Sequence, residues 1–211
     1  MASVEFYFDY SCPWSYFAFI RLTEAAKRTG SDILWRPIVL DRLLEQVNPG
    51  QPVSREPGDP RRAAYQAQDI EAWADYVGIT MNRPDEWPAD SGLAAIGAVI
   101  ADQQGQVAAF SDAVFSAYFG PNRDIADPVV LAELAAVAGL ERDAFEQELA
   151  NPDHGESVAA NTDRLFKRGG FGAPTLFVDE QMFFGNDRLP LVEFALGQRS
   201  DRKFVMPGQH G

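Results

Sequence analysis

The sequence has almost no cysteine or histidine. One cysteine, Cys12, and two histidines occur among 211 residues. A single cysteine closes no disulfide within the chain, and structural zinc sites use four cysteine or histidine ligands. The composition therefore excludes a disulfide framework and a Cys/His zinc site within one chain, and we expect no bound metal.

Long apolar segments are also missing. No apolar run is long enough to span a bilayer, so no membrane partner is expected. The first residues, MASVEFYFDYS, lack the basic region and the apolar core of a signal peptide. We therefore expect a cytoplasmic protein whose cysteine stays reduced.

Positive charge is scarce as well. Lysine and arginine number 18 against 31 aspartates and glutamates, which gives a formal net charge of −13. Such a chain is repelled by nucleic acid and by anionic membrane surfaces. The sequence also has no phosphate loop with lysine, no GxGxxG opening a helix and no HExxH. Nucleic-acid binding, nucleotide binding and zinc proteolysis are thus not indicated.

The composition is that of a globular protein, with 46% hydrophobic residues. Apolar periodicity predicts strands near both ends and helices between them. Pro37 lies inside the second strand, which is typical of an edge strand. The predicted order is strand Val4–Asp9, a helix from Pro13 to Thr29-Gly30, strand Ile33–Leu40, a loop at 48–60, helices over 60–168, strands Pro174–Val178 and Gln181–Phe184, and helix Leu189–Leu196.

Strands at the two ends must pair, because an isolated strand or hairpin is not stable in water. The simplest arrangement is one α/β domain built from both ends of the chain, with the helical block inserted between its halves. We expect this domain to comprise residues 1–45 and 165–200. The insertion then spans 46–164, and 201–211 form a flexible tail.

Cys12 is the first candidate functional residue. It follows a strand and precedes Pro13 at a helix start, where backbone N–H groups and the helix dipole stabilise a thiolate and lower its pKa below about 8.5. Ser15 is placed to donate a hydrogen bond to the sulfur. The alternatives are a small buried hydrophobe and an ordinary helix serine. The position between strand and helix favours the functional interpretation of Cys12.

Two glycine-containing turns are further candidates. Gly172-Ala173-Pro174-Thr175 enters a strand, where Pro174 is either a boundary marker or a cis proline. Gly185-Asn186-Asp187-Arg188 is either a turn with a helix cap or a clamp in which N–H groups bind a carboxylate and Asp187 binds an amine. Taken alone, each segment fits its structural interpretation.

Together these segments resemble a known family. FYFDYSCPWSYFA, FGAPTLFVD and MFFGNDRL are similar to segments of the 2-hydroxychromene-2-carboxylate isomerases, which are kin of the kappa-class glutathione transferases and the DsbA-type disulfide oxidoreductases. Pro84 to Ser91 resembles a proline-rich motif of these isomerases, with Asp90 where asparagine is usual. The similarity in order and spacing runs from about Val4 to Gly197.

The resemblance implies a thioredoxin-like domain with a central mixed sheet and an inserted all-helical domain. It implies that Pro174 is cis and that the cofactor is glutathione. The Ala173 backbone would pair with the cysteinyl part of glutathione, and the γ-glutamyl end would be held by Phe184, Gly185, Asn186 and Asp187. It also implies a homodimer, to which Phe110, Phe115 and Phe119 contribute unless they pack in the core.

The chain departs from the family at two places. The isomerases and kappa transferases usually have serine where Cys12 stands, and DsbA-type proteins have a second cysteine at the position of Ser15. The studied isomerases also have a lysine shortly after the second strand, near Leu44 here. For a substrate carboxylate the candidates are therefore Arg42 and Arg55. Trp87 is the candidate aromatic contact.

Three functions follow as hypotheses. The first is a glutathione-dependent isomerase for a small aromatic carboxylate, which in this family interconverts 2-hydroxychromene-2-carboxylate and trans-o-hydroxybenzylidenepyruvate through a reversible glutathione adduct. The second uses Cys12 as the thiol of a monothiol disulfide oxidoreductase or of a kappa-type glutathione transferase. The third is a non-enzymatic scaffold that binds a partner through its acidic surface.

Overall fold

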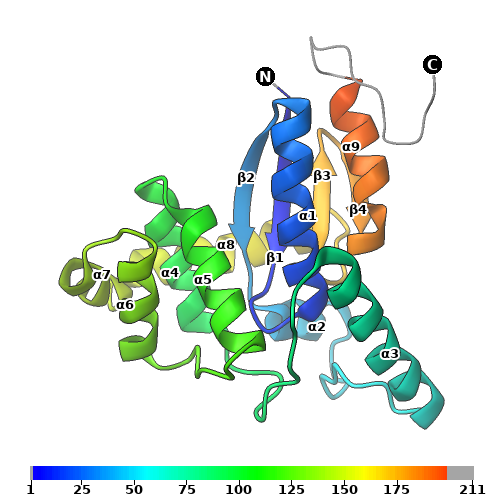
Figure 1. The fold of residues 1–211 in the computed structure, drawn as a ribbon, viewed down its shortest axis with the longest axis horizontal. Coiled ribbons are helices and arrows are strands. Elements are labelled where there is room, and N and C mark those ends of the chain that lie inside the picture. Colours follow the sequence, from blue (N-terminus) through cyan, green and yellow to red (C-terminus); the bar gives the residue numbers. More distant parts are fainter. Residues whose placement is uncertain (1, 199–211) are drawn as a thin grey trace.

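Four strands form one mixed sheet in this computed structural model, which describes residues 2–198. The strand order is β2-β1-β3-β4. The central strand β1 (Ser3–Phe8) runs parallel to β2 (Asp32–Pro37) and antiparallel to β3 (Thr175–Val178), and β4 (Gln181–Phe184) pairs with β3. Strands from both ends of the chain therefore share one sheet, which confirms the predicted α/β class and the thioredoxin-like arrangement (Figure 1).

Alternation along β1 assigns its side chains to the two faces of the sheet. Phe6 and Phe8 pack in one apolar cluster with residues of α1 (Pro13–Thr29) and α9 (Leu189–Gly197). Tyr7 points to the other face, in a cluster with residues of α2 (Leu40–Val47) and α8 (Pro152–Lys167). Both faces are thus covered by helices, and Figure 1 shows α1 in front of the strands and α8 behind them.

The ends of α1 follow the sequence prediction. Pro13 occupies the first turn, where its missing N–H removes no helical bond, and Gly30 ends the helix in the left-handed conformation at φ 65°. The predicted end of the second strand is wrong, because Leu40 begins α2. Its N–H donates to the buried carboxylate of Asp9, and a short apolar run does not reveal such a partner.

The helical block divides into two parts. The helices α4 to α7 form a bundle beside β2, whereas α3 lies apart from it (Figure 1). Segment 79–91 between them is irregular, so the predicted helical block is interrupted there. The helices span Pro60–Val77 (α3), Gly92–Gln103 (α4), Val107–Phe119 (α5), Pro128–Val137 (α6) and Arg142–Leu149 (α7).

The sheet and the bundle share a hydrophobic core. The rings of Phe8 and Phe115 lie 6.2 Å apart, and Phe115 also contacts Tyr10 at 4.8 Å. Phe110, Phe115 and Phe119 are at most 2% exposed, so these three rings pack in the core and offer no surface to a second subunit. The domain boundaries stay a prediction, and the tail at 201–211 lies outside the described residues.

No helix within residues 2–198 is long and apolar enough to cross a membrane.

Candidate functional site

Three segments that are distant in sequence meet at the start of α1. Cys12 is the N-cap of this helix, and its thiol donates to the carbonyl oxygen of Ala173 at 3.5 Å. The Ala173–Pro174 peptide bond is cis, as the family resemblance implies. The N–H of Gly185 donates to the carbonyl of Pro174 at 2.9 Å, which joins the proline turn to segment 184–187. The structure therefore brings the residues of both candidate turns together beside Cys12.

Burial sets the chemistry of Cys12. The residue is 4% exposed, and removal from water raises the pKa of its thiol, with the nearby Asp9 charge acting in the same direction. The hydrogen bond from Ser15 and the charge of Arg55 lower this pKa but do not compensate for burial. The predicted lowering of the pKa is therefore wrong, because burial disfavours the thiolate more than the hydrogen bonds of Ser15 and the charge of Arg55 favour it. At neutral pH Cys12 is a protonated thiol.

Asp9, directly after β1, organises the surroundings of Cys12. Its carboxylate is fully buried. One oxygen accepts from the N–H and the hydroxyl of Ser11, at 2.9 and 2.6 Å. The other accepts from the N–H of Leu40 and the hydroxyl of Ser91, both at 2.8 Å. A single carboxylate thus connects β1 to the starts of α2 and α4.

Arg55 provides the counter-charge for Asp9. Its guanidinium lies 3.3 Å from the Asp9 carboxylate, donates to the Ser11 hydroxyl at 2.5 Å and donates to Asp41 at 2.7 Å. The side chain is only 6% exposed. The structure therefore places Arg55 near Cys12 but engages its donors with protein groups, whereas Arg42 is exposed on α2. Their predicted contact with a substrate carboxylate stays a prediction.

The network around Asp9 is not apparent from the sequence. The local sequence shows only that Asp9 follows a strand of aromatic and aliphatic residues. An aspartate at such a position usually indicates a turn exposed to solvent. Its partners Leu40, Arg55 and Ser91 lie 31 to 82 positions away. No local pattern reports contacts of this range.

Arg21 holds segment 184–187 in place. Its guanidinium donates to the backbone carbonyl of Asn186 at 2.6 Å and to the Asn186 side chain at 3.2 Å. The same group lies 4.8 Å from the ring of Trp73 and 5.6 Å from that of Tyr76, both on α3. Asn186 is buried, and the side chain of Asp187 is 55% exposed beside it. Arg21 thus links α1, α3 and the predicted cofactor segment.

The residues at this junction fit a bound glutathione. Phe184 is 41% exposed and offers an apolar surface, and the accessible carboxylate of Asp187 matches an ammonium group. The backbone of Gly172 packs closely against Phe184, because a Cβ at Gly172 would lie 2.7 Å from the Phe184 ring. Gly185 has φ +100°, which L side chains rarely adopt. The apolar ring and the carboxylate therefore suit a small peptide that carries a free ammonium group at one end.

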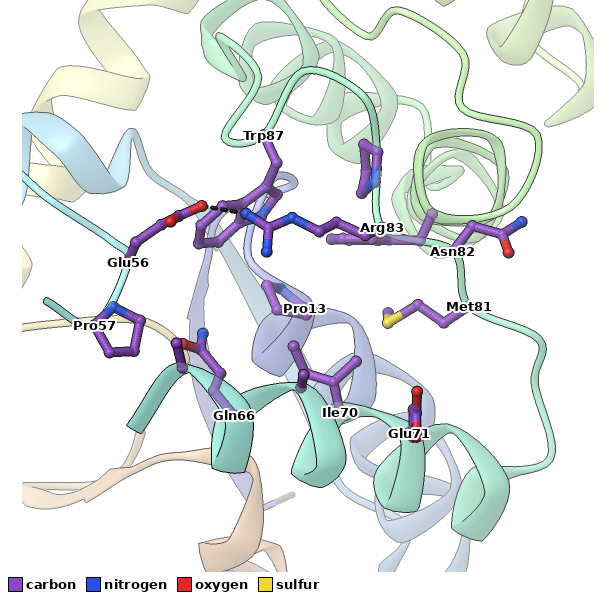
Figure 2. A pocket seen from close by; sticks show the side chains of 14 residues that line it. Pro13, Glu56, Pro57, Gln66, Ile70, Glu71, Met81, Asn82, Arg83 and Trp87 are labelled. Atoms are coloured by element: carbon purple, nitrogen blue, oxygen red, sulfur yellow. Dashed lines mark hydrogen bonds and ion pairs between the residues drawn. The ribbon is translucent and has the colours of Figure 1, made fainter. Parts of the chain in front are cut away.

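A pocket opens next to this junction. We call it the α3 pocket; its volume is about 190 Å³, and it lies between α3 and segment 81–87 (Figure 2). Pro13, the neighbour of Cys12, lines it, and so does Trp87. The indole N–H of Trp87 donates to the Ser11 carbonyl at 2.9 Å, which fixes the ring. Further lining residues are Glu56, Ala63, Ala67, Ile70, Glu71, Met81 and Arg83.

Apolar residues of α3 face the pocket instead of the protein core. Ala74 is the buried residue of this helix, whereas Ala67 and Ile70 face the α3 pocket. An apolar helix face that is not covered by protein is typical of a binding site.

The chain is similar to known proteins over almost its whole length. The sequence model of the DSBA-like thioredoxin domain matches residues 3–197. The 2-hydroxychromene-2-carboxylate isomerase of Sphingobium xenophagum is 34% identical over 192 residues, which cover 90% of this chain and 96% of that protein. The isomerase of the same name from Pseudomonas putida is 31% identical over 199 residues, with coverages of 92% and 94%. A solved 2-hydroxychromene-2-carboxylate isomerase superposes with a TM-score of 0.82 at 30% identity, covering 93% of this chain and 95% of its own.

Proposed function

Because the chain belongs to the DSBA-like thioredoxin domain family, and its isomerase relatives match nearly its full length, we propose that it is a glutathione-dependent isomerase of the 2-hydroxychromene-2-carboxylate isomerase type. The observation that carries the proposal is the placement of Cys12. Its protonated thiol lies against the cis-proline turn, and its neighbour Pro13 lines an apolar pocket. A bound thiol compound and an aromatic substrate would therefore meet at the start of α1.

The chain's own residues divide into two groups in this proposal. The Ala173 backbone holds the cysteinyl part of glutathione. Segment 184–187 holds the γ-glutamyl end, with the Asp187 carboxylate facing the ammonium group. The α3 pocket holds the substrate against its apolar wall and excludes water from the reacting carbon.

Bound glutathione supplies a thiolate whose reversible addition to a conjugated carbon converts a double bond into a rotatable single bond. Cys12, whose S–H donates to the Ala173 carbonyl here, would turn it toward that sulfur, a role that burial supports because the thiol stays protonated. The start of α1 adds the positive end of a helix dipole to the same position. In this role the thiol replaces the serine hydroxyl that relatives usually have here.

The proposal is tested with the isomerisation of trans-o-hydroxybenzylidenepyruvate, followed by its ultraviolet absorbance. We expect turnover that rises saturably with glutathione. Cys12→Ser should keep at least wild-type activity, because a hydroxyl is the stronger hydrogen-bond donor. Cys12→Ala should lose about tenfold in kcat, since one hydrogen bond to a charged group is removed. Turnover that is independent of glutathione overturns the proposal.

One observation favours a second candidate, disulfide exchange. A cysteine stands where the isomerases have serine, and a monothiol mechanism needs no second cysteine. Intact-protein mass spectrometry after incubation with oxidised glutathione tests it. Rapid formation of one glutathione adduct at pH 7, absent in Cys12→Ser, would favour disulfide exchange. The buried, protonated thiol leads us to expect slow adduct formation. A kappa-type transferase would instead release a product that retains glutathione.

A further inference from the structure

The α3 pocket has an arginine on its wall that the mechanism above does not use. The guanidinium of Arg83 lies 5.5 Å from the centre of the Trp87 ring. It also forms a hydrogen-bonded ion pair with the carboxylate of Glu56 (Figure 2). Both partners line the pocket. A cation is thus held between an aromatic ring and a carboxylate at the edge of an apolar cavity.

The backbone that carries Arg83 is firmly anchored. The N–H of Asn82 donates to the Phe119 carbonyl at 2.6 Å, and the Asn82 side chain donates to Gly120 at 2.7 Å. Further along, the N–H of Ala89 donates to the Tyr118 hydroxyl at 3.0 Å. The position of the Arg83 backbone is therefore set by α5, and an exchange of partners requires movement of side chains only.

The ion pair of Arg83 differs from those of Arg55 in exposure. The side chains of Arg83 and Glu56 are 71% and 57% exposed, whereas that of Arg55 is 6% exposed. An exposed ion pair is weak because water competes for both charges, and a buried one is held because neither charge can be left unpaired. Arg83 can therefore change its carboxylate partner at little cost, and Arg55 cannot.

We propose that Arg83 binds the carboxylate of an aromatic acid in the α3 pocket by exchanging Glu56 for that carboxylate. Glu56 engages one nitrogen of the guanidinium, Nη2, whereas guanidinium groups can bind a carboxylate through two parallel N–H bonds, so an incoming carboxylate can bind Arg83 at least as well as Glu56 does. The ring of the acid packs on the apolar wall formed by Ala67, Ile70 and Met81. This inference rests on the proposed function and specifies its substrate site.

The exchange makes Glu56 a competitor of the substrate. Glu71 is a matched control, because it also lines the pocket but lies away from the Arg83–Glu56 pair (Figure 2). Glu56→Gln and Glu71→Gln each remove one negative charge from the pocket. Only the first frees Arg83.

Isothermal titration with trans-cinnamate and its uncharged analogue cinnamamide tests the site in the full chain without glutathione. Relative to wild type, we expect Arg83→Met to weaken cinnamate binding about tenfold. Glu56→Gln should tighten it about threefold, as expected for loss of an exposed ion pair. Glu71→Gln should leave it within about twofold, because a separated charge is screened by salt. Cinnamamide affinity should stay unchanged in all variants.

Any of three results overturns the inference. The first is equal cinnamate affinity in wild type and Arg83→Met, and the second is an equal gain in cinnamate affinity in Glu56→Gln and Glu71→Gln. The third is the absence of cinnamate binding in both wild type and Glu56→Gln. Circular dichroism verifies that each variant is folded. Because no glutathione is present, this test fails separately from the proposed function. Cinnamate binding without glutathione-dependent turnover overturns the isomerase proposal alone. Glutathione-dependent turnover without cinnamate binding overturns the Arg83 site alone.

Discussion

At the residue scale, Cys12 is governed by its loss of contact with water. The helix start and the Ser15 hydroxyl both stabilise a thiolate, yet burial raises the pKa of the thiol overall. The sequence reveals the helix start, because Pro13 marks it, but it does not reveal how deeply the sulfur is buried. The balance between the two effects is therefore a property of the folded chain.

This balance predicts slow alkylation of native Cys12. We expect iodoacetamide to modify it at least about ten times more slowly than free cysteine at pH 8, because the thiolate is the reactive form. Rates from pH 7 to 10, measured by mass spectrometry, check this. The pKa of Cys12 in the folded chain lies above the unfolded value of about 8.5. The contribution of Cys12 to the free energy of unfolding is therefore fully present below about pH 8.5, and it is lost as the pH rises through the folded-state pKa. Alkylation as fast as free cysteine would contradict the assignment.

Asp9 gives a second prediction at this scale. Asp9→Asn removes the buried charge that faces Arg55 and replaces one acceptor oxygen by a donor. We expect a loss of about 3 kcal/mol in the free energy of unfolding by urea, because a buried charge loses its partner. Asp41→Asn is the control: Asp41 also pairs with Arg55 but is 42% exposed, so its loss should stay below about 1 kcal/mol. Equal effects of the two substitutions would refute the central role of Asp9.

At the scale of elements, Arg21 connects α1 and α3 to segment 184–187. Arg21→Met keeps an apolar stem beside the α3 rings but removes the bonds to Asn186. On the proposed function, we expect KM for glutathione to rise about tenfold while kcat changes little, since a positioning residue is lost. Arg28→Met, which breaks a pair with Glu193 on α9, should leave KM for glutathione unchanged. A fall in kcat alone would contradict this role.

Elements with strong local signals were predicted from the sequence. The helix α1 begins at Pro13 and ends at Thr29, before Gly30 with φ 65°, as the sequence predicts. The helix α2 was missed because its start depends on Asp9, which is distant in sequence. Likewise the family resemblance implies the cis Pro174 and the use of segment 184–187, whereas no local pattern indicates the Arg21 contact that holds this segment. Residues that are neighbours in sequence indicate where a helix or strand begins and ends. They do not indicate the distant side chains that hold this element in place.

At the scale of the whole molecule, the sheet and the helical bundle are joined by one core. Phe115 of α5 packs against Phe8 of β1, Tyr10 and Phe19 of α1. We expect a single unfolding transition, with tryptophan fluorescence and far-ultraviolet circular dichroism changing together in urea. Phe115→Ala should lower the free energy of unfolding by about 3 to 5 kcal/mol without separating the two signals. Two resolved transitions would show that the halves fold independently.

The pairing of β1 with β3 also has a consequence for synthesis of the chain. β1 ends at Phe8 and β3 begins at Thr175, so the central strand lacks its antiparallel neighbour until the residues of β3 have left the ribosome. At roughly 5–20 residues per second this delay is on the order of ten seconds or more. During that time Phe6 and Phe8 stay uncovered by β3 and α9. The helical block, whose Phe115 packs on Phe8, is therefore synthesised before the sheet can be completed.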